Sequence, residues 1–182
     1  LSVSYNPAGA EHDVYLYQVT PTNSPQDAIV INEVMASNGS TAADENGQFE
    51  DWVELYNAGT SSVDLAGWYL TDTPFEPTKW QMPGGTVMAP GTYMIVWADE
   101  DQSQGAMHAN FKLSGSGESV LLNDTDTLLV DHVDFGEQVT DQGYARVPNG
   151  SGPFIIQVPT FGANNDNVGI GETPGTTGFR LY

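Results

Sequence analysis

Short runs of alternating or continuous apolar residues recur along the chain, separated by turn-forming residues. No stretch keeps apolar residues at the 3.6-residue spacing of an amphipathic helix for long enough to predict one. Short runs interrupted by Gly, Pro and Asn predict the strands of an all-β sandwich or barrel. The expected strands are Val14–Val19, Ala28–Met35, Trp52–Tyr56, Gly67–Thr71, Thr92–Ala98, Ser119–Asn123, Leu128–Phe135 and Gly143–Val147.

The two ends of the chain differ from its middle. Residues 1–27 combine a candidate β-hairpin with a polar, proline-rich stretch, which indicates an extra strand pair or the tail of a preceding domain. Residues 166–182 are rich in Asn, Gly and Thr, which indicates a linker and the start of a following segment. One domain is therefore expected over residues 28–165. Because the chain starts at Leu1 in mid-pattern, we expect it to be part of a larger protein.

Ordered blocks of sequence in the predicted domain resemble the bacterial lamin-tail domain family. They are Ile31–Asn38, Glu50–Asn57, Val63–Asp72, Lys79–Pro83, Ala89–Ala98, His108–Ser114, Asp134–Gly136 and Pro159–Asn164. The resemblance implies an immunoglobulin-like β-sandwich of the lamin-tail type. It also implies an accessory module of a large exported bacterial protein. Residues 178–182, with the sequence Gly-Phe-Arg-Leu-Tyr, are similar to the lead-in of a type IX secretion sorting domain.

The strand patterns place the large apolar side chains inside the sandwich. Val53 and Leu55 alternate along one strand and share a face, as expected for a strand with one side on the core. The chain has four Trp, and each lies within a strand pattern and not at a loop tip. Trp clusters also stack sugars in carbohydrate-binding modules, but this placement favours core packing between two sheets.

Composition narrows the functions that this domain can have. Four Lys and Arg against 24 Asp and Glu give a net charge of −20, which opposes binding to nucleic acids and to anionic membranes. Such a surface is typical of a soluble protein that meets salt outside the cell, and some of its carboxylates are candidates to hold Ca²⁺. The chain has no Cys, which excludes disulfides, thiolate zinc sites and thiol catalysis within it.

No group of residues predicts catalysis. His12, His108 and His132 lie in separate segments without a partner at the spacing of a metal site or a proton relay, and we expect His108 to be structural. No Ser occupies a nucleophile elbow, and Ser114–Gly117 is typical of a turn. We therefore expect a chain that is not itself an enzyme.

Two acidic loops are the candidate metal sites. Asp44, Asn46 and Asp51 belong to the first, and Asp99 and Asp101 belong to the second. Their carboxylate and amide oxygens are the ligands that Ca²⁺ prefers. The first loop lacks the Gly and Glu of an EF-hand, so a solvated acidic loop without metal is the other interpretation.

Two functions from different classes remain open. The first is a non-catalytic accessory module of a secreted or cell-surface bacterial protein, which mediates adhesion, substrate proximity or domain spacing. Its partner would be an extracellular polymer or protein, with no nucleic acid and no membrane insertion, and the isolated chain would be a monomer. The alternative is a Ca²⁺-dependent carbohydrate-binding module, suggested by the acidic loops and the aromatic content.

Overall fold

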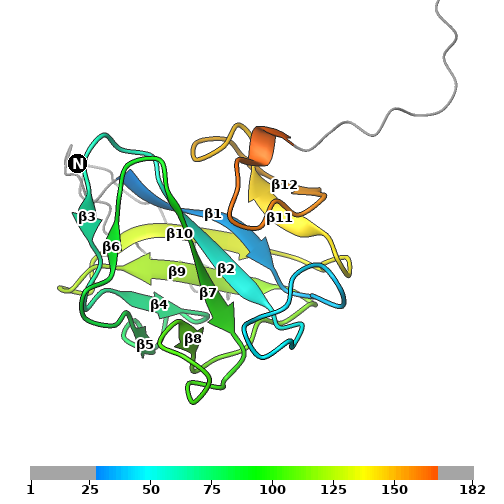
Figure 1. Ribbon diagram of the computed structural model, residues 1–182, viewed down its shortest axis with the longest axis horizontal. Coiled ribbons are helices and arrows are strands. Elements are labelled where there is room, and N and C mark those ends of the chain that lie inside the picture. Colours follow the sequence, from blue (N-terminus) through cyan, green and yellow to red (C-terminus); the bar gives the residue numbers. More distant parts are fainter. Residues whose placement is uncertain (1–27, 168–182) are drawn as a thin grey trace, which may run out of the picture.

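The computed structural model of the chain describes residues 28–167, which form two packed β-sheets and a short two-stranded ribbon (Figure 1). The larger sheet has the strand order β12 (Phe154–Gln157), β11 (Gly143–Arg146), β1 (Ile29–Met35), β2 (Trp52–Asn57), β7 (Tyr93–Ala98) and β8 (His108–Ala109). The smaller sheet has the order β10 (Leu129–Phe135), β9 (Glu118–Asn123), β4 (Tyr69–Thr71) and β5 (Trp80–Gln81). The ribbon pairs β3 (Val63–Asp64) with β6 (Val87–Met88), and a 3₁₀ turn, η2 (Asn165–Asn167), ends the described chain.

The all-β sandwich expected from the sequence is confirmed. Seven of the predicted strands correspond to β1, β2, β4, β7, β9, β10 and β11, with ends that differ by at most two residues. The eighth, Val14–Val19, lies outside the described residues. The pairings are antiparallel except for β7 and β8, which run parallel.

The space between the two sheets holds the main hydrophobic core. Ile31 and Leu55 from the larger sheet and Leu70 and Leu122 from the smaller sheet are fully buried there. All four Trp are buried, with exposed fractions of 0 % for Trp52, 2 % for Trp68, 3 % for Trp80 and 6 % for Trp97. The expected burial of the Trp side chains is confirmed, but only Trp68 and Trp80 belong to the core between the sheets, whereas Trp52 and Trp97 pack in a separate cluster.

The outer face of the larger sheet is also buried, which the alternation along Trp52–Tyr56 did not predict. Val53 and Leu55 face the main core as expected, but Trp52 and Glu54 on the opposite side of β2 have no exposed surface either. Met35, Trp52 and Trp97 form a second, smaller core there. The Phe161 ring covers it, with its centroid 5.3 Å from that of Trp52 and 5.5 Å from that of Trp97. A strand inside this sheet therefore contacts protein on both sides.

One ion pair joins the two sheets. Arg146 on β11 donates two hydrogen bonds of 3.0 Å to the Asp131 carboxylate on β10 and one of 2.8 Å to the Ile31 carbonyl on β1. Asp131 also accepts the Ile31 N–H at 2.8 Å, at the irregularity in the pairing of β1 with β2. The guanidinium lies 4.4 Å from the centre of the Phe154 ring. Arg146 thus provides hydrogen bonds to the Ile31 carbonyl, at the irregularity in the strand pairing, and to the Asp131 carboxylate.

Arg146→Lys should destabilise the protein by about 2 kcal/mol although it keeps the positive charge. The three guanidinium nitrogens bond separately to the Asp131 carboxylate, the Ile31 carbonyl and the Gly152 carbonyl, which a single ammonium nitrogen cannot reproduce, and the pair is largely shielded from water. Urea unfolding followed by Trp fluorescence measures the change. Lys112→Met, at an exposed position, is the control and should change the free energy of unfolding by less than about 0.5 kcal/mol. A loss in Arg146→Lys as small as that in the control would show that the guanidinium contacts do not contribute to stability.

Candidate metal centre

Three ionisable side chains from distant parts of the sequence meet at one end of the larger sheet. Asp44 lies on the loop before β2, Asp99 directly follows β7, and His108 begins β8. Because β2 runs antiparallel to β7, the start of β2 and the end of β7 lie at the same end of the sheet. The three side chains each offer a ligand atom, and these atoms lie within 4.8 Å of one another.

His108 is buried and lies between two carboxylates. Its Nδ1 lies 2.5 Å from Asp99 Oδ2, and its Nε2 lies 3.2 Å from an oxygen of Glu45, whose side chain is 59 % exposed. Burial lowers the pKa of the imidazole, but the hydrogen bonds to Asp99 and Glu45 and the charges of both carboxylates outweigh burial and raise it overall. The ring stacks on Trp97 at a centroid separation of 6.4 Å. Both nitrogens of the ring therefore have defined partners.

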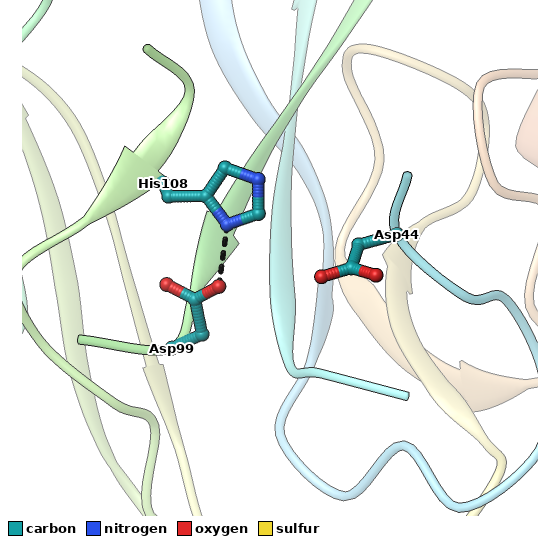
Figure 2. A group of neighbouring side chains, drawn as sticks. All are labelled: Asp44, Asp99 and His108. Atoms are coloured by element: carbon teal, nitrogen blue, oxygen red, sulfur yellow. Dashed lines mark hydrogen bonds and ion pairs between the residues drawn. The ribbon is translucent and has the colours of Figure 1, made fainter. Parts of the chain in front are cut away.

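The Asp44 carboxylate faces His108 and Asp99. One of its oxygens accepts hydrogen bonds, and the other has no partner among the described residues. Its Oδ1 accepts hydrogen bonds of 2.8 Å from the backbone N–H groups of Asn46 and Gln48, which fix the loop. Its Oδ2 is buried and accepts no hydrogen bond from the described residues. Figure 2 shows the Asp44 carboxylate projecting toward His108 and Asp99 from the opposite side of the group. A buried oxygen without a partner costs about 1–3 kcal/mol, and more when it is charged.

Gln104 joins the two loops that carry these residues. Its side-chain amide accepts a bond of 2.6 Å from Asn46, donates one of 2.5 Å to Gln48 and donates one of 2.7 Å to Asp101. Gly105 follows, and a Cβ there would lie 2.9 Å from a Glu45 oxygen and 3.0 Å from the His108 ring. The backbone therefore packs closely around one side of the group.

The five candidate Ca²⁺ ligands of the two acidic loops have different surroundings in the structure. The structure brings Asp44 and Asp99 together from the two predicted loops. Asp101 lies outside this group and accepts hydrogen bonds from Ser103 and Gln104, which lower its pKa. Asp51 is also outside the group: its carboxylate accepts the Asn38 N–H, and burial raises its pKa to about 6. Asn46 donates its side-chain amide to Gln104.

His108 is the member of the group that sequence reasoning missed. Its partners lie nine residues away, at Asp99, and 63 residues away, at Glu45, so no short spacing marks it. The parallel pairing of Trp97 with His108 places the imidazole beside the end of β7, and this pairing has no signal in the local pattern. His132 lies elsewhere, on β10, with Nε2 4.0 Å from Asp134 Oδ2.

A second group of buried polar side chains lies on the outer face of the larger sheet, the face that carries Trp52. Glu33 on β1 accepts the N–H of Thr160, at 3.1 Å to Oε2, and the hydroxyl of the same residue at 2.6 Å. Its neighbour Glu54 on β2 accepts from Asn32 at 2.8 Å and from the Gly162 N–H at 2.7 Å. Burial raises the pKa of each carboxyl to about 7, and these hydrogen bonds offset only part of that effect.

These contacts fix residues 158–167 on the sheet. Asn165 is fully buried and donates its side-chain amide to the carbonyls of Asn32 and Arg146, each at 3.0 Å. Asp166 accepts the backbone N–H of Asn149 at 3.0 Å. The domain boundary expected at residue 165 falls within the turn η2, which contacts the sheet.

The two mostly antiparallel sheets, packed face to face on the main core, define an immunoglobulin-like β-sandwich. The family model of the Lamin Tail Domain matches residues 22–137, which is well over half of the chain. The chain therefore belongs to the lamin tail domain family, whose members are immunoglobulin-like, non-enzymatic domains. No curated protein matches the chain in a sequence search. Within residues 28–167 there is no helix of the length and apolar character needed to cross a bilayer.

Proposed function

We propose that the chain is an accessory module of a secreted or cell-surface bacterial protein, and that it mediates adhesion, substrate proximity or domain spacing. The observation that carries this proposal is the match to a family of non-enzymatic, immunoglobulin-like domains over residues 22–137. Sandwiches of this architecture recur as building blocks of cell-surface proteins, where a rigid core supports variable loops. The net charge of −20 is consistent with a soluble module that avoids nucleic acids and anionic lipids.

The alternative, a Ca²⁺-dependent carbohydrate-binding module, has less support. Sugar rings stack on exposed aromatic faces, whereas all four Trp of the chain are buried in its two cores. The residues of the two candidate Ca²⁺ loops make separate contacts, and the group that does form takes one residue from each loop together with an imidazole. Ca²⁺ prefers an all-oxygen shell of six to eight ligands.

A binding screen of the 182-residue chain distinguishes these functions. The labelled protein is tested on a glycan array, on bacterial cell-wall polymers and against extracellular bacterial proteins, with Ca²⁺ and with a chelator. We expect saturable binding to one polymer or protein that does not depend on Ca²⁺ and persists at about 0.5 M salt, where nonspecific charge effects are screened. If the chain binds no glycan, cell-wall polymer or protein in these tests, domain spacing would remain as its role.

Two outcomes of the screen would contradict the proposal. Glycan binding that disappears with the chelator and returns with Ca²⁺ would favour the carbohydrate-binding alternative. Turnover of a bound polymer by the purified chain would show that the module is an enzyme. The chain unfolded in urea serves as the control for binding that depends on charge alone.

A further inference from the structure

We propose that Asp44, Asp99 and His108 bind a divalent first-row transition metal of the Zn²⁺ type, which clamps the loop before β2 to the ends of β7 and β8. Asp44 Oδ2, Asp99 Oδ2 and His108 Nδ1 are the assigned ligands. This site goes beyond the proposed accessory role and does not depend on it. The first support is the geometry, since one ligand atom from each residue lies within 4.8 Å of the others.

The chemistry of the ligands selects the type of metal. An imidazole nitrogen with carboxylate oxygens suits Zn²⁺ and its neighbours in the first transition row, whereas Ca²⁺ and Mg²⁺ require oxygen ligands in greater number. Zn²⁺ binds His and carboxylate ligands at about 2.0–2.2 Å, so ligand atoms in a tetrahedral site lie about 3.3 Å apart. Side-chain movements would bring the three atoms to that separation, from 2.5 Å between His108 Nδ1 and Asp99 Oδ2 and from no more than 4.8 Å for the group as a whole.

Asp44 provides the second, independent support. The residue is more than nine-tenths buried, its Oδ2 has no hydrogen-bond partner among the described residues, and its carboxylate faces Asp99 and His108 (Figure 2). The Asp99 carboxyl and the His108 ring are buried beside it, so two carboxyl groups share this interior position. A divalent cation compensates both charges and supplies the missing partner of Oδ2.

Glu45 fits the surroundings of such a site. A His that binds a metal through one nitrogen commonly donates its other N–H to a carboxylate, which fixes the ring. Here Nδ1 lies on the side of Asp99, and Nε2 lies 3.2 Å from a Glu45 oxygen. Metal binding at Nδ1 would replace the proton that His108 and Asp99 share and would leave the bond to Glu45 in place.

Calorimetric titration of the chelator-treated 182-residue chain with Zn²⁺, and separately with Ca²⁺, tests the site. We expect one Zn²⁺ per chain at His108 with a Kd in the micromolar range or below, and weaker binding of Ca²⁺. Saturating Zn²⁺ should raise the melting temperature by about 5 °C, because a ligand that binds only the folded state stabilises it. Absence of saturable Zn²⁺ binding, or tighter binding of Ca²⁺, would overturn the proposal.

Asp44→Asn is the decisive variant, because it keeps the oxygen that accepts from Asn46 and Gln48 and removes the ligand oxygen. We expect Zn²⁺ affinity to fall at least tenfold, while the melting temperature without metal stays the same or rises. Asp101→Asn, on the loop of Asp99 but outside the group, should change the affinity by less than about twofold. Unchanged affinity in Asp44→Asn would contradict the assignment.

The other two His residues require their own control. A chain with His12→Gln and His132→Gln should bind Zn²⁺ as tightly as the unmodified chain. Loss of binding in that double variant would place the metal elsewhere and overturn the site at His108.

Discussion

Gly143→Ala should destabilise the protein by about 3 kcal/mol or more. A Cβ at this position would lie 1.8 Å from Oε1 of the buried Glu33, so the carboxylate must move away. Movement of Glu33 would break its bonds to the N–H and hydroxyl of Thr160. Overpacking costs about 1–3 kcal/mol, and buried groups that lose their partners cost a similar amount. Urea unfolding gives the change directly.

A double-mutant cycle shows whether Glu33 is the cause. In a Glu33→Ala background the clash is gone, so Gly143→Ala should cost at least about 1 kcal/mol less than in the unmodified chain. Gly84→Ala is the matched control, because a Cβ there meets nothing within 4 Å, and it should change stability by less than about 0.5 kcal/mol. If the stability losses of Gly143→Ala and Glu33→Ala simply add in the double variant, the clash with Glu33 is not the reason that glycine is required at position 143.

The second large effect is a loss of stability with rising pH that originates at Glu33 and Glu54. Both carboxyls have a pKa of about 7 in the folded protein because they are buried, against an unfolded value of about 4.3. Their pKa is raised on folding, so their stabilising contribution is full below about pH 4.3 and is lost as pH rises through about 7. The change amounts to roughly 3 kcal/mol for each group.

The comparison of the unmodified chain with Glu54→Gln isolates this effect. Glu54 faces the hydrogen-bond donors of Asn32 and Gly162 and the carboxyl of Glu33, whose charge also raises its pKa. His108 and Asp51 also have a raised pKa, but their contributions cancel in the difference. As the pH rises from 5 to 8, the free energy of unfolding of Glu54→Gln should therefore increase relative to that of the unmodified chain.

The exposed Glu76→Gln is the control for this pH series and should show a constant difference. The measurement is the free energy of unfolding from urea titrations at several pH values between 4 and 8. A difference between Glu54→Gln and the unmodified chain that does not change with pH would contradict the raised pKa of Glu54.

The sequence predicted the fold well where strands are long and apolar. β1, β7 and β10 combine apolar residues over six or seven positions, which the pattern detects. The strands β3, β5, β6 and β8 have two residues each and carry no periodicity, so pairing with their neighbours in space defines them. Residues 154–157 form the edge strand β12, which the pattern also did not predict.

The candidate site could be predicted only in part. The acidic loop residues singled out from the sequence include Asp44 and Asp99, which the structure brings together. The third member, His108, depends on the parallel pairing of β7 and β8, which brings residues 97 and 108 side by side. The burial of Glu33 and Glu54 was equally invisible in the strand pattern, because residues far along the chain, 158–167, cover that face.

X-ray diffraction from crystals of the chain grown with Zn²⁺, recorded above and below the zinc absorption edge, tests the metal centre most directly. We expect an anomalous peak between Asp44, Asp99 and His108, about 2.0–2.2 Å from one atom of each, with Glu45 still bonded to Nε2 of the ring. Density that shows His108 bonded directly to Asp99, with no anomalous peak beside Asp44, would contradict it.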